Sequence, residues 1–220
     1  MIDKVVRSPA EAVAGVRDGS TVLVGGFGAA GEPVQLLEAL VRQGASDLTV
    51  VSNNGGSGDV GLAALLQARR VRKLVCSYPR TPGSWVFQEL YRAGEIELEL
   101  VPQGTLSERI RAAGAGIGGF FTRTGVGTEL AAGKEVRVIE SQQYVLEQPL
   151  PAEVALVKAD QADRWGNLTY RKSARNYNPT MAMAARLTIV QASRVVPLGA
   201  LDPEAVVTPS VYVDRVLEVS

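Results

Sequence analysis

Four glycines follow an apolar run near the start of the chain. The run Thr21–Val24 has the composition of a β-strand, and glycine stands at positions 25, 26, 28 and 31 directly after it. Because glycine lacks a side chain, the backbone N–H groups of such a loop can approach a ligand closely, and loops of this kind hold phosphates and other oxyanions. Residues 25–31 are therefore a candidate binding loop, with a tightly packed strand-to-helix turn as the alternative.

The spacing of Gly26, Gly28 and Gly31 also matches GxGxxG, the pattern of dinucleotide-binding folds. Those folds place an acidic residue about 20 positions further on, at the end of the second strand, to bind the ribose. Here the next apolar run, residues 48–51, ends in Ser-Asn-Asn and carries no acid. The missing acidic residue argues against NAD binding, and a dinucleotide-binding oxidoreductase domain is kept only as an alternative.

Amide side chains stand at two further turn positions. Asn53 and Asn54 follow the run 48–51, where asparagine can form an ordinary turn or face a ligand. Gln103, in a loop between Pro102 and Gly104, can satisfy loop backbone groups or orient an acyl carbonyl. We expect the site role for Gln103 and leave both roles open for the two asparagines.

Basic side chains form a second group of candidates. Arg80 follows a β-type run and either binds the distal carboxylate of a dicarboxylic acid or covers the surface. The stretch TYRKSARN contains Arg171, Lys172 and Arg175. These side chains either bind an anion, such as a phosphate or a carboxylate, or lie in solvent at the end of a strand. Cys76 lies inside an apolar run, which predicts a buried, inert thiol.

Apolar β-type runs alternate with helical segments through the first half of the chain. Strands are expected at 22–26, 48–52, 73–77 and 96–102, each followed by a helix, at 33–44, 60–70, 84–94 and 106–116. Such alternation predicts an open, mostly parallel α/β sheet with crossover helices, and it gathers the loops at the strand carboxyl ends on one edge. From residue 136 onward strand and turn signals dominate, which predicts an added antiparallel layer that contacts partners.

Composition excludes several classes of protein. The chain has 220 residues, 46% of them hydrophobic, and one domain over 1–220 can bury a sizeable core. Lys plus Arg equals Asp plus Glu at 23 each, so we expect binding neither to nucleic acid nor to a membrane. A single cysteine and the polar N-terminal stretch MIDKVVRSPAEAV predict a cytoplasmic protein. Histidine is absent, which removes imidazole bases and His metal sites.

The whole window DGSTVLVGGFGAAGEP, residues 18–33, resembles the first signature of the family I CoA-transferases. The resemblance continues through LTVVSNN (48–54), VPQGTL (101–106), TGVGT (124–128), DRWGNLTYRKSARNYNP (163–179) and LDPE with TPSVYVDRV (201–216). The chain looks like an A, or alpha, subunit of the enzymes that act on 3-oxoacids. The stretches GDVGLAALL (58–66), VCSYPR (75–80) and WVFQELYRAG (85–94), with DRWGN, are most similar to the 3-oxoadipate enzymes.

This resemblance implies an activity that needs a partner. Family I enzymes pass CoA between carboxylic acids through a glutamyl-CoA thioester, and the catalytic Glu belongs to the B subunit, in a Ser-Glu-Asn-Gly motif. The nearest match here is Ser-Asn-Asn-Gly at 52–55, where Asn53 stands in place of the glutamate. An amide can donate hydrogen bonds but cannot form a thioester. The resemblance therefore implies no catalytic nucleophile in this chain and a heterodimer or heterotetramer with a B subunit.

The resemblance also implies the substrates, succinyl-CoA and a 3-oxoacid. Acetoacetate or acetate is the alternative acceptor to 3-oxoadipate, and a phosphosugar-binding or isomerase-like module is the alternative function. No metal and no bound cofactor is implied, since CoA is a substrate. The candidate CoA-binding residues are Gly25, Gly26, Phe27, Gly28, Ala29, Ala30 and Gly31, and the candidate acyl-pocket residues are Asn53, Asn54, Gln103, Gly104 and Arg80.

Overall fold

One large sheet organises the chain. The structure is a computed structural model and describes residues 2–219. The strands of the large sheet are β1 (Val5–Val6), β2 (Thr21–Val24), β3 (Leu48–Asn54), β4 (Val71–Tyr78), β5 (Glu97–Leu100), β9 (Ala152–Asp163), β10 (Leu168–Thr169), β11 (Ala185–Val196) and β12 (Arg215–Glu218).

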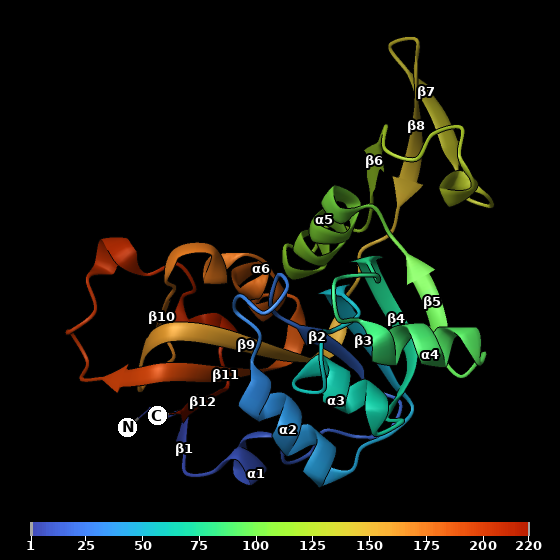
Figure 1. Cartoon of the computed structure of the whole chain (residues 1–220). Helices are drawn as coiled ribbons and strands as arrows, with labels where there is room; N and C mark the ends of the chain where they lie inside the picture. Colours follow the sequence, from blue (N-terminus) through green and yellow to red (C-terminus); the bar gives the residue numbers. More distant parts are fainter. Residues whose placement is uncertain (1, 220) are drawn as a thin grey trace.

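The strands lie in the order β1-β12-β11-β9-β2-β3-β4-β5, and every pair along this path is parallel. Only the short β10 runs antiparallel, beside β9. From β2 the chain proceeds outward through β3, β4 and β5, whereas from β9 it proceeds to the other side through β11 and β12 (Figure 1). Neighbouring strands β2 and β9 therefore mark the point where the direction of winding reverses.

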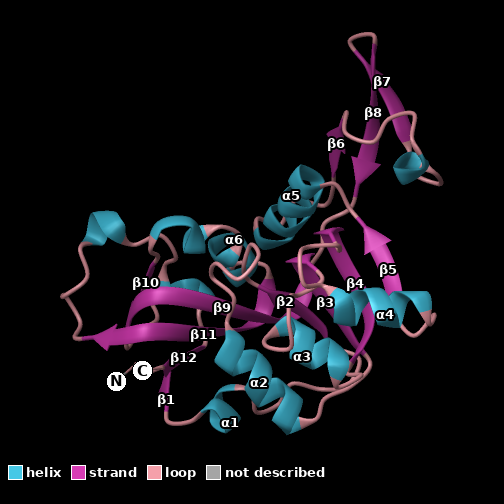
Figure 2. Cartoon of the chain, in the orientation of Figure 1, coloured by secondary structure: helices cyan, strands magenta, loops and turns pink. Residues whose placement is uncertain are grey.

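Helices cover both faces of this sheet, as the parallel arrangement requires. Helices α2, α3 and α4 pack on one face, and α5 and α6 lie on the other (Figure 2). No helix among residues 2–219 is long and apolar enough to cross a membrane. The helices are α1 (Pro9–Ala12), α2 (Val34–Gln43), α3 (Leu62–Gln67), α4 (Trp85–Arg92), α5 (Gln103–Gly114) and α6 (Asn178–Ala182).

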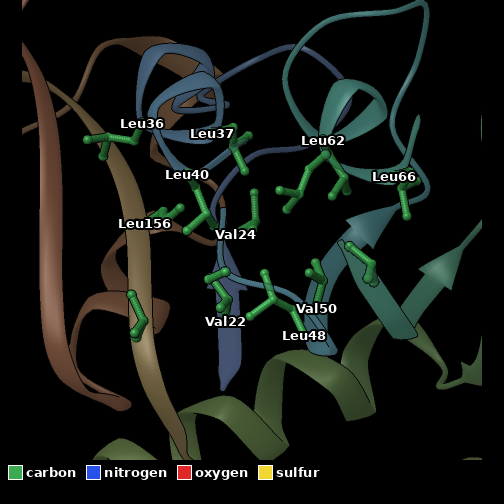
Figure 3. Close-up of a cluster of buried hydrophobic side chains, with 14 of the residues drawn as sticks. Val22, Val24, Leu36, Leu37, Leu40, Leu48, Val50, Leu62, Leu66 and Leu156 are labelled. Atoms are coloured by element: carbon green, nitrogen blue, oxygen red, sulfur yellow. The ribbon is translucent and has the colours of Figure 1, made fainter. Parts of the chain in front are cut away.

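The central strands are apolar throughout because each face has its own core. Side chains alternate across a strand, so Val22 and Val24 of β2 pack under α2 and α3, whereas Leu23 faces α5 and α6. Figure 3 shows the first of these cores, with Leu36 and Leu40 of α2 above the strands. Burial on both faces explains why the strands in the first half of the chain are short continuous runs of apolar residues.

A small second sheet projects from the body of the molecule (Figure 1). It contains β6 (Phe120–Thr122), β7 (Val136–Ile139) and β8 (Gln142–Glu147), which are antiparallel in the order β6-β8-β7. The predicted fold class is confirmed, but the extent of the antiparallel layer was wrong. Strands β9, β11 and β12 instead join the large parallel sheet. They carry apolar side chains on both faces, and in that sheet both faces are buried.

A side chain from a distant strand completes the start of α2. Pro33 precedes the helix and its side chain offers no acceptor to the first turn. Instead Gln191, buried on β11, accepts hydrogen bonds from the backbone N–H groups of Gln35 (3.0 Å) and Leu36 (3.3 Å) through Oε1. This tertiary cap fixes α2 against β11 and so fixes where the loop after β2 must end.

Replacing Gln191 by Leu keeps most of the side-chain volume and removes the acceptor for two N–H groups. We expect the free energy of unfolding to fall by about 1–3 kcal/mol, the cost of leaving buried donors without a partner. Urea unfolding measures the loss. The exposed Gln67, at the end of α3, is the control, and Gln67→Leu should change stability little. Equal effects of the two substitutions would contradict the capping role of Gln191.

Candidate functional site

Loops at the carboxyl ends of the strands converge on a cavity of about 370 Å³. The loop after β2 contributes Phe27, and the start of α5 contributes Gln103 and Gly104. Four loops were predicted to converge at this edge, residues 25–31, 52–56, 78–80 and 103–104. The first and the last of them line this cavity, and Asn53 of the second contacts Gln103 beside it. The other lining residues are Ser107, Asn176 and Tyr177.

The glycine loop has a tightly packed base. Gly25 and Gly31 are buried, and a Cβ atom added to either would overlap the side chain of Asn178. Gly31 also has a positive φ of 78°, which residues with a side chain rarely adopt. At these two positions glycine is required by packing, as the strand-to-helix alternative predicted.

The tip of the same loop is open. Phe27 and Ala30 close a tight turn by pairing their backbone groups, at 3.0 and 3.3 Å. A Cβ atom added to Gly28 would meet no atom within 4 Å. The N–H groups of Gly28 and Ala29 donate to no acceptor within residues 2–219, so they are free to meet a ligand. Packing explains the base of the loop but does not explain glycine at the tip.

Asn53 lies buried at the end of β3 beside this edge. Its Oδ1 accepts hydrogen bonds from Ser77 Oγ (3.0 Å) and from Gln103 Nε2 (3.4 Å). Ser77 belongs to β4, the next strand of the sheet, so the amide is held from two sides. Since its oxygen is occupied, the NH₂ group of Asn53 is the part that can donate to a ligand.

Gln103 is not in a loop, contrary to the prediction. It is the first residue of α5, and it is exposed. Tyr177 Oη donates to the backbone carbonyl of Gln103 at 3.1 Å. Burial raises the pKa of Tyr177 to about 12, so the hydroxyl keeps its proton at neutral pH. The tyrosine and Asn53 together fix the position of Gln103 at the cavity wall.

Asn54 and Arg80 stand apart from the cavity. Asn54 Oδ1 accepts the backbone N–H of Gly56 at 2.8 Å, which is the local turn that asparagine favours. Arg80 follows β4 on the carboxyl edge, is exposed, and forms no ion pair within residues 2–219. Neither residue lines the cavity of Gln103, and their roles toward an acyl group stay predictions.

Two other chemically notable residues have structural explanations. Cys76 is fully buried, and desolvation raises the pKa of its thiol to about 12, which leaves it unreactive at neutral pH. Asp163, in the stretch DRWGN, accepts the backbone N–H groups of Trp165, Gly166 and Asn167 at 2.9 to 3.0 Å. This carboxylate holds the turn between β9 and β10.

Sequence reasoning gave no role to three residues that build this edge. Asn178, buried in α6, donates to the carbonyl of Gly31 (3.1 Å) and accepts the N–H of Lys158 (2.9 Å). Asn176 donates to the carbonyl of Ala30 at 2.8 Å. Together with Tyr177 they form the stretch Asn-Tyr-Asn after the basic turn. That stretch was available as a signal, because amides and a phenol cluster there with no apolar periodicity.

Glu32 was also missed. Its Oε1 accepts the backbone N–H of Leu62 at 3.0 Å and so caps α3. Burial raises its pKa above the ordinary value, because desolvation outweighs both this hydrogen bond and the positive charge of Lys158.

Comparisons with known proteins decide the family. A family model described as coenzyme A transferase matches residues 6–219. Over all of its 220 residues the chain is 61% identical to the A subunit of the 3-oxoadipate CoA-transferase of Pseudomonas putida, of which it covers 95%. This chain belongs to the coenzyme A transferase family. It is also 49% identical, over 97% of its length and 89% of the relative, to the A subunit of a probable succinyl-CoA:3-ketoacid coenzyme A transferase of Bacillus subtilis.

Solved structures agree with this assignment at the level of the fold. An acyl-CoA transferase from Escherichia coli O157:H7, in a thioester complex with CoA, superposes with a TM-score of 0.86 at 22% identity. The match covers 99% of this chain and 50% of that one, so this CoA-transferase chain spans half the length of that protein. The family resemblance found in the glycine window and the later motifs is confirmed.

Two substitutions separate the base of the glycine loop from its tip in this CoA-transferase chain. Gly25→Ala places a methyl group against buried Asn178 and should lower the free energy of unfolding by about 1–3 kcal/mol through overpacking. Gly28→Ala enters open space, and only its φ of 60° opposes the side chain, which costs about 1–2 kcal/mol. Thermal unfolding of both variants gives the order of stability. A Gly28→Ala variant less stable than Gly25→Ala would contradict this division.

Glu32 gives a prediction about pH. A carboxyl whose pKa is raised on folding stabilises the folded state while protonated; this contribution is present below the unfolded pKa and is lost as pH rises through the folded pKa. Glu32→Gln keeps an acceptor for the N–H of Leu62 and has no charge to desolvate. We therefore expect the variant to gain stability over the parent between pH 4 and pH 7, measured by urea unfolding. If the stability gain of the variant instead shrinks as the pH rises, the pKa of Glu32 is lowered on folding, which contradicts the prediction.

Proposed function

We propose that this chain is the A subunit of a 3-oxoacid CoA-transferase, which moves CoA from succinyl-CoA to 3-oxoadipate in a cytoplasmic heteromer with a B subunit. Support comes from the relative in Pseudomonas putida, which is named as the A subunit of a 3-oxoadipate enzyme. The relatives named for 3-ketoacids are less similar, at 49% identity and 51% identity. For this reason acetoacetate is the second candidate acceptor.

The chemistry of the cavity wall is the observation that carries this proposal. The lining side chains of Phe27, Gln103, Ser107, Asn176 and Tyr177 include amides and hydroxyls, but none is a carboxylate, a thiol or an amine. Such a wall can donate hydrogen bonds to an acyl oxygen, yet it cannot supply the carboxylate that forms a thioester. This lining supports a nucleophile that is supplied by a second chain facing this edge.

Negative charge develops on the thioester oxygen when a carboxylate attacks the carbonyl carbon. Donors aimed at that oxygen stabilise the transition state, and one such donor contributes about 2.7–4 kcal/mol in well-studied acyl-transfer enzymes. Gln103 and Asn53 are suited to this role, because each keeps NH₂ hydrogens that the hydrogen bond between them does not use. Residues 28 and 29 at the tip of the glycine loop add two backbone N–H groups near the same edge.

The two candidate oxoacids differ in charge. 3-Oxoadipate carries a second carboxylate that acetoacetate lacks, and a closed pocket has to pair it with a cation or with several donors. The cavity at Gln103 has no cationic side chain on its wall. Arg80, exposed on the same edge, remains the proposed partner for that carboxylate, and the B subunit is the other source of a cation.

Reconstitution tests the proposal. The chain alone should not consume succinyl-CoA with 3-oxoadipate, whereas the complex with a B subunit that carries Ser-Glu-Asn-Gly should do so. In that complex Gln103→Ala should lower kcat by roughly a hundredfold, as expected for loss of one donor to the oxyanion. Gln67→Ala, on α3, is the control. Robust turnover by the chain alone would overturn the split site, and a preference of the complex for acetoacetate would replace the proposed oxoacid.

A further inference from the structure

A second cavity, of about 280 Å³, borders the glycine loop at Ala30 and does not include Gln103 among its lining residues. Its walls come from the end of that loop, from β9 and β11, and from the short 3-10 helix η2 (Lys172–Arg175). The chemically active groups around it are Lys158, Asp160, Arg171, Lys172, Ser173 and Ser193.

The charge of this cavity is unbalanced. Three cations, Lys158, Arg171 and Lys172, face one carboxylate, that of Asp160. Within residues 2–219 none of these cationic side chains has a carboxylate within ion-pair distance. Bringing like charges together without partners opposes folding, and an anionic ligand that pairs with them would offset this cost.

The cavity lies where an α/β sheet of this topology binds ligands. It opens between the loop after β2 and strand β9, which are the neighbours at which the winding reverses. In open parallel sheets the crevice at this switch point, beyond the carboxyl ends of the strands, is the usual ligand position. Basic residues at a switch point are therefore placed for a ligand and not only for solvation.

The basic wall is also held in a fixed position. Asn176 donates to the carbonyls of Ala30 and Ser173, both at 2.8 Å, and thereby ties η2 to the glycine loop. Lys172 adopts a left-handed conformation with φ 51°, which is unfavourable for a side chain of this kind. A strained, anchored turn that presents a cation is preorganised for binding.

We propose that this basic cavity binds phosphate groups of the CoA substrate, an inference that rests on the proposed function. The turn 27–30 separates it from the neutral cavity at Gln103, since Phe27 lines one cavity and Ala30 the other. A CoA thioester has the same polarity, with a neutral acyl end and phosphates at the other end. The basic cavity, with a volume of 280 Å³, suits a phosphate or diphosphate group with part of a nucleotide, because pockets for whole drug-sized molecules begin near that size.

The test uses the complete complex, with its B subunit present, and the variants Arg171→Gln and Lys172→Gly. Glycine at 172 removes the charge and tolerates the positive φ, so this variant should fold at least as well as the parent. Each variant should raise KM for succinyl-CoA roughly fivefold or more, with kcat and the KM for the oxoacid within about twofold; the exposure of both side chains limits the effect. Arg186→Gln is the charge-matched control, because Arg186 is exposed near the opposite end of β11.

Substrates that lack the 3′-phosphate identify the group that is bound. If succinyl-3′-dephospho-CoA shows no further KM increase in the variants, the cavity takes the 3′-phosphate; if the increases multiply, it takes the diphosphate. Unchanged KM for succinyl-CoA in both variants of an active complex would overturn the inference. So would binding of inorganic phosphate that the variants abolish while KM for succinyl-CoA stays unchanged, since the anion would then be free phosphate. A wild-type complex without CoA transfer would instead refute the proposed function.

Discussion

One buried amide holds the carboxyl edge of the large sheet together. Asn178 is fully buried and joins three segments that are far apart in sequence: its Oδ1 accepts the N–H of Lys158 on β9, and its NH₂ donates to the carbonyls of Gly31 and Ala174. A buried amide of this kind has to have its hydrogen bonds satisfied, and here the glycine loop, β9 and the basic turn satisfy them. Gly25 lacks a side chain because the amide occupies that space.

This constraint gives the edge two different cavities. Because Asn178 and its neighbour Asn176 fasten residues 171–177 to the loop after β2, the same backbone forms a wall of each cavity. One wall presents amides and hydroxyls, and the other presents cations. A shift of the turn would change both walls at once, so the shapes of the two cavities are coupled through the loop.

The parallel half of the fold could be predicted from the sequence because burial on both faces leaves a direct trace. Runs such as Thr21–Val24, followed by glycine and a helix, are typical of strands that are covered on both sides. The added layer was wrong for β9, β11 and β12, since an apolar run does not show which neighbour it pairs with. Long-range pairing, such as Gln191 with α2, leaves no local signal at all.

The candidate site could be predicted in part. The part that was missed comes from residues that are far apart in the sequence. Residues 25–31, Asn53 and Gln103 each stand at the end of a predictable strand, so their common edge follows from topology. Asn176, Tyr177 and Asn178 come from a segment without regular periodicity, and only the packing of α6 brings them there. Gln103 was placed in a loop because Pro-Gln-Gly reads as a turn, whereas Pro102 in fact precedes the first turn of α5.

Three ionisable groups near this edge are buried or engaged by the fold. Cys76 and Tyr177 have their pKa values raised to about 12 by burial, so neither is an anion at neutral pH. Glu32 is a carboxylate, but the N–H of Leu62 engages it, and desolvation disfavours its charge. Among the residues that line the two cavities only Asp160 carries a carboxylate, and it lies at the basic cavity and not at the wall of Gln103. In the proposed function, a partner chain that faces the wall of Gln103 supplies the attacking carboxylate there.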